Sequence, residues 1–372
     1  MISKKNILFI IGDASGGIRK HISSIITELP TNEYNVSLIY SSNNVDKWFE
    51  QNGADLLSLC EGFKSINIQK KIHWTDIVNF FYILNYARKN KFDIIHAHGA
   101  KAGFFGRTVG KLLRLKTIYT PHGGSLHNKK SKYSNYLYNN IEKFLYYFTD
   151  TFIFESYYSY NQYNKHIFKI NDKKKFHINW NGITKKVTTK SSSFIIDGKT
   201  TTKIGFIGRL EAEKGFDIFL ETLEILNSIN FNFEAHIFGS GNYNINFISK
   251  NTLKKCIFHG DSPEVDAFIT NLDLVIIPSR YESFGYVALE AIASGTIPIS
   301  SRVGGLKEIF LNFDILSVKE NNAKSIVNKI LYINSLNEEE VLYLGEELIS
   351  KLNKDFNIKK MITNLHSIYQ TM

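Results

Sequence analysis

Short apolar runs, each ended by glycine or proline, recur along the chain and predict buried parallel strands. The clearest are residues 6–11, 234–238 and 274–277, which are rich in branched and aromatic side chains. Near the end of the chain the apolar positions take helical spacing, so residues 357–369 predict an amphipathic helix. Strands that alternate with helices indicate a doubly wound α/β fold.

The length of 372 residues is too great for one core and suits two domains. We place the boundary just after residues 181–183, because residues 184–202 are rich in Lys, Ser and Thr and lack helical periodicity. The predicted domains are residues 1–184 and 185–355, each a Rossmann-like α/β layer, followed by a final segment, residues 356–372.

The run of residues 278–291 places two carboxylates, Glu282 and Glu290, eight residues apart where a predicted strand turns into a helix. On a helix they would lie near one face, roughly 12 Å apart along the axis. The backbone N–H groups of a helix start attract phosphate, and carboxylates accept hydrogen bonds from sugar hydroxyls. An acid favoured by the helix dipole plus a solvated surface acid is the alternative. The residues expected to open the helix are Ser283, Phe284 and Gly285.

Residues 203–215 read as a strand, a glycine turn at Gly208, and a helix start that carries Arg209 and Lys214. Ligands of open α/β sheets bind beyond the carboxyl ends of the strands, where these two cations would stabilise a diphosphate leaving group. Two solvated side chains on a turn remain the alternative. The loop at Gly239 to Gly241 also follows a predicted strand, but a lone Gly-x-Gly is usually only a turn.

The segment after the first strand contains Gly16 and Gly17, where glycine would let the backbone approach a ligand closely. Its spacing is not that of the dinucleotide-binding fingerprint, which disfavours a dehydrogenase. A simple strand-to-helix turn is the alternative. Histidines end two further predicted strands, at His96, His98 and His122, where they would donate to hydroxyls or phosphate and change charge near neutral pH. We expect one of the alternating pair to pack inside the sheet, His96 in the first place.

Together these segments resemble the retaining GT-B glycosyltransferases of family four, which include sucrose synthase and bacterial mannosyltransferases. The resemblance covers nearly the whole chain and rests on residues 208–215, on the Glu282 and Glu290 pair, and on Gly304-Gly305 with Glu308. It implies a GT-B fold, with two Rossmann-like domains facing across a cleft. The first domain would bind the acceptor, the second would bind the nucleotide sugar, and residues 356–372 would cross back onto the first domain as a helix.

The resemblance also implies roles for the residues singled out above. Arg209 and Lys214 would bind the donor diphosphate, Glu282 and His122 would hold the donor sugar, and Glu290 would bind the ribose. No metal or other cofactor is expected, because no Asp-x-Asp motif is present and the two cations would replace a divalent ion. The remaining residues implied in donor binding are Gly16, Gly17, Gly208, Gly239, Ser283, Phe284 and Gly285.

Charge is uneven: residues 1–185 hold 26 Lys and Arg against 13 Asp and Glu, whereas residues 186–372 hold 19 against 22. A basic acceptor domain favours an anionic membrane surface or a lipid diphosphate as partner. The aromatic residues between positions 133 and 148 equally suit an ordinary packed helix, and no nucleic-acid-binding signature accompanies the positive charge. The candidate membrane contacts are Lys129, Lys130, Lys132, Tyr133, Tyr136, Tyr138, Phe144, Tyr146, Tyr147 and Phe148.

Cys60 and Cys256 show neither metal-ligand nor disulfide spacing, and such sparse cysteine fits a reducing cytosol. The first apolar run is too short for a secretory signal, and no segment approaches the roughly 20 apolar residues that span a bilayer. We therefore predict a cytoplasmic protein at the inner face of the cell membrane.

The predicted function is transfer of a sugar from a nucleotide-diphosphate donor, preferably a UDP-sugar, to a glycan or polyprenyl-diphosphate-linked acceptor in surface polysaccharide synthesis, such as capsule or O-antigen. The resemblance implies retention of the anomeric configuration. Two alternatives stay open: a non-hydrolysing nucleotide-sugar 2-epimerase, for which Asp13 is the obvious acid in the first half, and a non-catalytic scaffold of a glycan assembly complex.

Overall fold

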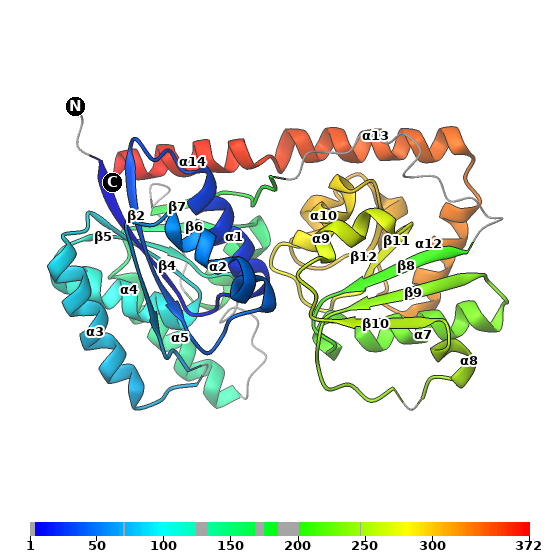
Figure 1. Ribbon diagram of the computed structural model, residues 1–372, viewed down its shortest axis with the longest axis horizontal. Helices are drawn as coiled ribbons and strands as arrows, with labels where there is room; N and C mark the ends of the chain where they lie inside the picture. Colours follow the sequence, from blue (N-terminus) through cyan, green and yellow to red (C-terminus); the bar gives the residue numbers. More distant parts are fainter. Residues whose placement is uncertain (1–3, 70, 124–131, 168–174, 185–200, 246) are drawn as a thin grey trace. The chain divides into compact units, whose positions relative to one another are not determined.

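A computed structural model of the chain describes residues 4–69, 71–123, 132–167, 175–184, 201–245 and 247–372. The chain divides into two compact units, unit 1 with Met1–Gly182 and Ile358–Met372, and unit 2 with Ile183–Asn357. Each unit holds a parallel sheet covered by helices (Figure 1), which confirms the predicted α/β class. Most of the predicted linker lies outside the described residues, as do Lys129 and Lys130 and the side chains of Lys132 and Tyr133.

The sheet of unit 1 has the order β3-β2-β1-β4-β5-β6-β7. Its strands are β1 (Lys5–Ile11), β2 (Tyr34–Ser41), β3 (Gly62–Ile66), β4 (Ile94–His98), β5 (Lys116–Thr120), β6 (Thr151–Phe154) and β7 (Phe176–Ile178). Its helices are α1 (Gly16–Glu28), α2 (Lys47–Ser58), α3 (Thr75–Asn90), α4 (Ala100–Leu113), α5 (Lys132–Tyr146), α6 (Tyr157–His166) and α14 (Ile358–Thr371).

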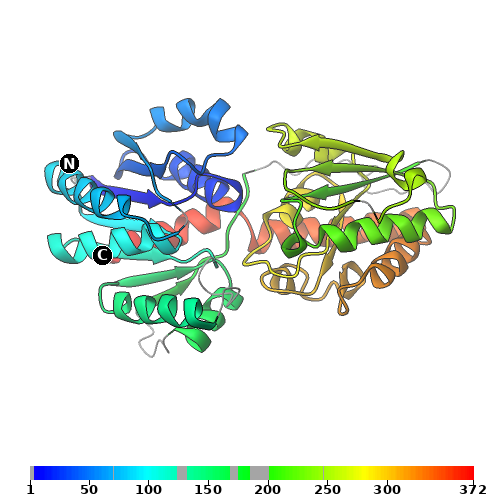
Figure 2. The same cartoon turned by 90° about the horizontal axis from the view of Figure 1, so that it is seen from below.

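Alternate side chains of β1 pack into two different cores, because successive strand residues point to opposite faces of the sheet. Ile7 and Phe9 pack with α1, α2 and α14, whereas Leu8 and Ile10 pack with α3 and α4. Figures 1 and 2 show α14 and α3 on opposite sides of this sheet. Unit 1 therefore uses the last helix of the chain to complete one of its two layers.

The sheet of unit 2 has the order β10-β9-β8-β11-β12-β13. Its strands are β8 (Thr202–Ile207), β9 (Phe233–Phe238), β10 (Cys256–Gly260), β11 (Leu274–Ile277), β12 (Ile297–Ser301) and β13 (Ser317–Val318). Its helices are α7 (Phe216–Ser228), α8 (Lys250–Leu253), α9 (Val265–Phe268), α10 (Tyr286–Ala293), α11 (Leu306–Ile309), α12 (Ala323–Asn334) and α13 (Glu338–Asp355), with short 3-10 turns at Ala212–Lys214, Ile269–Asn271 and Asp314–Leu316.

The strands predicted over residues 6–11, 234–238 and 274–277 are confirmed as β1, β9 and β11, to within one residue at each end. The structure divides the units after Gly182, two residues before the predicted boundary, and α14 begins at Ile358 within unit 1. No helix in the described part of the chain is long and apolar enough to cross a membrane.

Candidate functional site

Three loops meet at the carboxyl edge of the unit 2 sheet, after the adjacent strands β8, β11 and β12. The backbone N–H of Arg280 donates to the carbonyl of Glu213 at 2.9 Å, and that of Gly305 donates to the carbonyl of Glu282 at 3.0 Å. The Asn321 side chain donates to the carbonyl of Pro278 at 2.9 Å. Backbone bonds therefore join the β11 loop to the loops after β8 and β12, and Asn321, which follows β13, adds a side-chain bond, at the edge where open α/β sheets bind ligands.

Two glycines make this packing possible. Gly215 has φ of +71° and Gly304 has φ of +53°, a conformation that favours glycine. A Cβ atom on Gly215 would lie 1.9 Å from the carbonyl oxygen of Pro278, and one on Gly304 would lie 1.6 Å from that of Glu282. The Gly304-Gly305 element of the sequence thus holds the backbone of Glu282 in place.

Lys214 and Glu282 form the central ion pair of this edge. The Lys214 Nζ lies 2.6 Å from Glu282 Oε2, and the two side chains are 25% and 18% exposed. The hydroxyl of Ser279 donates to the same oxygen at 3.4 Å. Both side chains are accessible to solvent. Each can therefore give up its contact with the other and bind a ligand that carries an anion and hydroxyl groups.

Arg209 follows β8 and is the more exposed of the two predicted cations, with 56% of its side chain accessible. Its guanidinium lies 2.7 Å from Glu211 and 3.4 Å from Glu213. Neighbouring Gly208 and Gly239 are closely packed, since a Cβ on Gly239 would lie 2.0 Å from the carbonyl oxygen of Gly208. These two glycines serve the contact between the β8 and β9 loops.

The expectation that Glu282 and Glu290 share one helix face is wrong. Helix α10 begins at Tyr286, so Glu282 lies in the preceding turn. The helix cannot extend back through Gly285, which has φ of +117°. Glu290 does lie on α10 and is buried, with 6% of its surface exposed.

The segment that opens α10 combines a buried side chain with available backbone donors. The Phe284 ring is buried against Phe356, with ring centroids 5.9 Å apart. The backbone N–H groups of Phe284 and Gly285 donate to none of the described residues. Ser283 precedes these two residues. Their N–H groups lie at the start of α10, the positive end of its helix dipole, which suits an anion.

Arg280 lies inside the same sequence run, but sequence reasoning gave it no role. Its guanidinium lies 2.7 Å and 2.5 Å from the two carboxylate oxygens of Asp217. Burial raises the pKa of Asp217, but the bonds from Arg280 outweigh burial and leave that pKa lowered. The pair ties the β11 loop to α7, and no spacing signal connects two residues so far apart in the sequence.

In unit 1, the Gly16-Gly17 loop is already engaged with an acid. The backbone N–H of Gly16 donates to Asp46 at 3.0 Å, and Arg19 lies 3.1 Å from the same carboxylate. Gly16 has φ of +52°, with open space where a Cβ would stand. This glycine is therefore explained by its turn conformation. The N–H group that was expected to face a ligand donates its hydrogen bond to Asp46 instead.

His122 is held by protein groups on both ring nitrogens. Its Nδ1 lies 2.5 Å from Glu155 Oε2 and its Nε2 lies 3.0 Å from His98 Nδ1. Glu155, which sequence reasoning missed, is buried directly after β6. Nothing but its place after an apolar strand distinguishes it in the sequence.

The expectation for the alternating pair needs correction. His96 and His98 both point to the same face of β4, as residues two apart on a strand must, and both are fully buried. His96 bonds to Tyr369 at 2.8 Å and to Thr120 at 2.9 Å, which is the core role expected of it. Burial, followed by repulsion from neighbouring histidines, lowers the pKa of His96 and His98 well below the usual value. These two rings stay neutral at neutral pH, contrary to the prediction.

Two family models match the chain. The model described as Glycosyltransferase Family 4 matches residues 15–185, and the model described as Glycosyl transferases group 1 matches residues 190–347. Together they span most of the sequence, one on each unit.

Individual relatives agree. A protein of Klebsiella pneumoniae, described as an uncharacterized 41.2 kDa protein in cps region, is 31% identical over 239 residues, covering 62% of this chain and 66% of that protein. An uncharacterized glycosyltransferase of Methanocaldococcus jannaschii is 26% identical over 377 residues, covering 96% and 95%. The structure of Anabaena HepE in complex with UDP-glucose has a TM-score of 0.75 at 15% identity, covering 99% and 100%, a likeness of fold alone.

Proposed function

Because the chain belongs to the group 1 glycosyltransferases of family 4, we propose that it transfers a sugar from a UDP-linked donor to a hydroxyl group of a glycan or lipid-linked acceptor. The proposal includes retention of the anomeric configuration and a role in the synthesis of a surface polysaccharide such as capsule. A UDP-sugar donor is supported by the bound UDP-glucose of HepE, and the polysaccharide by the cps-region protein.

The observation that carries the proposal is the ion pair of Lys214 and Glu282 at the carboxyl edge of the unit 2 sheet. A nucleotide sugar offers a diphosphate to the ammonium group and hydroxyl groups to the carboxylate, so one ligand satisfies both members. Charge-assisted hydrogen bonds of this kind are about twice as strong as neutral ones. The pair is therefore assigned to the junction between the diphosphate and the sugar.

The leaving diphosphate is the centre of the proposed reaction, because negative charge develops on it as the sugar bond breaks. Lys214, Arg209 and the N–H groups of Phe284 and Gly285 would stabilise that charge. Glu290 is assigned to the ribose hydroxyls. In this proposal Gly208, Gly239 and Ser283 line the donor site in unit 2.

His122 stays in the proposal at the donor sugar, with its ring oriented by Glu155. The transfer is proposed to need no divalent cation, since Lys214 and Arg209 supply the positive charge that a metal would otherwise bring. Binding and turnover in the presence of EDTA test this point directly.

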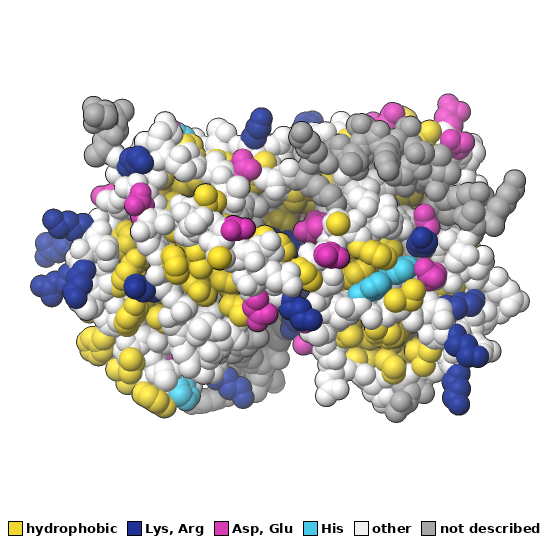
Figure 3. All heavy atoms as spheres, viewed as in Figure 1, with side chains coloured by type: hydrophobic (Ala, Val, Ile, Leu, Met, Phe, Trp, Pro, Cys, Tyr) yellow, Lys and Arg dark blue, Asp and Glu magenta, His cyan; other side chains and the backbone are white. Residues whose placement is uncertain are grey.

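We further propose that unit 1 docks on an anionic bilayer at the cytoplasmic face of the cell membrane. Apolar side chains gather along α3 (Figure 3), where Trp74, Ile77 and Phe81 are exposed. The acid of this helix, Asp76, is paired with Lys101 at 2.8 Å, and α4 contains no Asp or Glu. Exposed apolar residues on α3, beside the helix α4 that carries no acid, suit a charged membrane surface. On α5 and just after it, Tyr136, Phe144 and Tyr147 are also exposed.

The membrane proposal is tested by flotation with phosphatidylglycerol vesicles. Phe81→Ser should weaken vesicle binding, whereas Tyr343→Ser, at an exposed aromatic of unit 2, should not. Equal binding of the two variants and the wild type would count against α3 as the contact.

The donor proposal is tested by a thermal-shift screen of UDP, GDP, ADP and CMP and their sugar conjugates, with Mg²⁺ or with EDTA. Specific binding raises the midpoint by mass action. Metal-independent stabilisation by UDP-sugars is expected.

Incubation with a labelled UDP-sugar then separates the alternatives, because an epimerase alters the nucleotide sugar without an acceptor and a scaffold alters nothing. Product NMR reports the anomeric configuration.

A further inference from the structure

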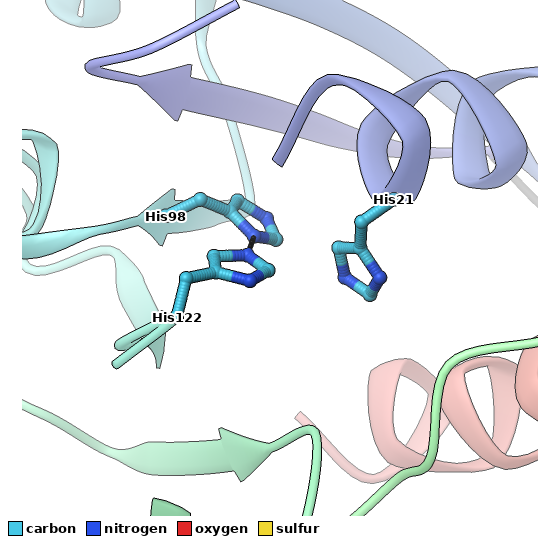
Figure 4. Close-up of side chains that lie close together, drawn as sticks. All are labelled: His21, His98 and His122. Atoms are coloured by element: carbon cyan, nitrogen blue, oxygen red, sulfur yellow. Dashed lines mark hydrogen bonds between the residues drawn. The ribbon is translucent and has the colours of Figure 1, made fainter. Parts of the chain in front are cut away.

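Three histidines from separate elements of unit 1 converge on one point (Figure 4). His21 lies on α1, His98 ends β4, and His122 lies two residues beyond β5. Each residue offers one ring nitrogen, and these three nitrogens all lie within 4.8 Å of one another. Within the described residues this is the group of side chains best arranged to hold a metal ion.

The topology of the sheet explains the convergence. Strands β1, β4 and β5 are parallel neighbours, and His98 lies opposite Ile11 on one side and Thr120 on the other. Helix α1 follows β1 and packs on the same face, which brings His21 above the strand ends. The backbone of His122 has φ of +51°, in the turn that directs its ring toward His98.

The buried rings of His21 and His98 have properties that suit metal ligands. Burial, followed by repulsion from neighbouring histidines, lowers the pKa of His21 and His98 well below the usual value, so both rings are neutral and keep a lone pair. The Nδ1 of His21 is buried and has no hydrogen-bond partner among the described residues, whereas the Nδ1 of His98 faces the Nε2 of His122 at 3.0 Å. Buried polar atoms in native proteins normally have a partner.

Glu155 completes the arrangement. Its carboxylate lies 2.5 Å from His122 Nδ1, which leaves Nε2, the nitrogen nearest His98, as the atom of this ring that would face an ion. Metal-binding histidines commonly donate their other ring N–H to a carboxylate in this way. His96 differs, because Tyr369 and Thr120 occupy both of its nitrogens.

We propose that His21, His98 and His122 bind one divalent transition-metal ion of the zinc class, with Glu155 positioning His122. Imidazole ligands suit Zn²⁺, which takes three histidines at about 2.0–2.1 Å and leaves a fourth position for water. His98 and His122 are 3.0 Å apart at their facing nitrogens, close to the spacing of two ligands on one tetrahedral ion. The ion would join α1 to the ends of β4 and β5.

The test uses the full chain without a histidine tag, freed of metal with EDTA and titrated with Co²⁺ as a visible-absorption reporter, then with competing Zn²⁺. One Co²⁺ per chain with tetrahedral bands is expected, together with a rise in the melting temperature on Zn²⁺ addition. The variants H21Q and H98Q should lose both signals. H96Q, in the same core, and H259Q, which breaks the His236 and His259 pair of unit 2, should keep them.

Absence of a Co²⁺ spectrum in the wild type, or its retention in H21Q and H98Q, would overturn the proposal. An equal loss in H96Q would also overturn it, since the variants would then act through the fold. E155Q leaves all three imidazoles in place and provides a second measurement if a histidine variant does not fold. Its affinity for Zn²⁺ should fall about 10- to 100-fold, and an unchanged affinity would contradict the positioning role.

Discussion

The ammonium nitrogen of Lys214 lies 2.6 Å from a carboxylate oxygen of Glu282, although the two residues are 68 positions apart in the chain. They meet because β8 and β11 are neighbours in the unit 2 sheet and each strand is followed by a loop at the same edge. Such a partly exposed pair adds little to stability, typically less than about 1 kcal/mol. Binding and folding effects at this pair should therefore be separable.

Replacing Glu282 with Gln should reduce sugar transfer about 100-fold or more, because the amide cannot offer two charged acceptor oxygens to the sugar. The free energy of unfolding should change by less than about 1 kcal/mol. Initial rates with a labelled UDP-sugar and urea unfolding measure the two effects. Glu346→Gln, at an exposed position on α13 of the same unit, is the matched control. Wild-type transfer by Glu282→Gln would remove this residue from the site.

Replacing Arg209 with Gln should lower kcat/KM for the UDP-sugar about tenfold or more, which corresponds to roughly 1.4 kcal/mol of lost interaction with the diphosphate. The fold should be unaffected, because this side chain is largely exposed. Arg302→Gln is the control, since Arg302 also pairs with an acid of unit 2, Asp314, at 3.0 Å. If the two variants were equally active, the diphosphate assignment of Arg209 would fail.

Gly304→Ala should impair donor binding through the position of Glu282. The added Cβ would lie 1.6 Å from the carbonyl oxygen of Glu282, so the loop that carries this acid must move. Gly260→Ala is a close control, because Gly260 also has positive φ but open space where the Cβ would stand. It should cost only the left-handed strain of about 1–2 kcal/mol. Isothermal titration with UDP compares the two variants, and equal affinity would contradict the packing argument.

A buried ion pair in unit 1 predicts a large effect on stability. Arg107 donates to Glu142 at 2.8 Å and 3.1 Å, and both residues are almost completely buried. Glu142→Ala would leave the guanidinium buried without its counter-charge and should lower the unfolding free energy by about 3–5 kcal/mol. Denaturant-induced unfolding of the variant and the wild type measures this loss of free energy. Asp314→Asn, which alters the exposed pair with Arg302, should cost less than about 1 kcal/mol.

The sequence predicted what depends on local pattern. Short branched runs ended by glycine or proline identified β1, β9 and β11, because buried parallel strands and their breakers leave a signal within a few residues. The same reasoning found Lys214 and Glu282 through the loops that follow strands. It failed at the start of α10, where Gly285 has positive φ and lies against Leu306, so close that an added Cβ would be 2.6 Å from that side chain.

The contacts that sequence reasoning missed all join distant segments. Asp46 caps the Gly16 loop, Asp217 binds Arg280, and Glu155 binds His122. Each is one acid among many, with no periodicity or motif that points to its partner. Only the order of strands in the sheets brings these residues together, and that order is not contained in any local window of sequence.

The buried histidines of unit 1 predict a pH dependence of stability. Burial lowers the pKa of His21, His96 and His98 in the folded chain, whereas the unfolded chain has a histidine pKa of about 6.5. Below about pH 6.5 the unfolded state therefore binds more protons, so stability falls as the pH falls, by up to about 1.4 kcal/mol per pH unit for each histidine. Urea unfolding of the full chain between pH 8 and pH 5 measures this slope. His98→Gln should reduce the slope by one histidine's share, while His73→Gln, at an exposed position before α3, should leave it unchanged. A slope that did not respond to His98→Gln would mean that this ring is charged in the folded state or that other groups dominate the titration.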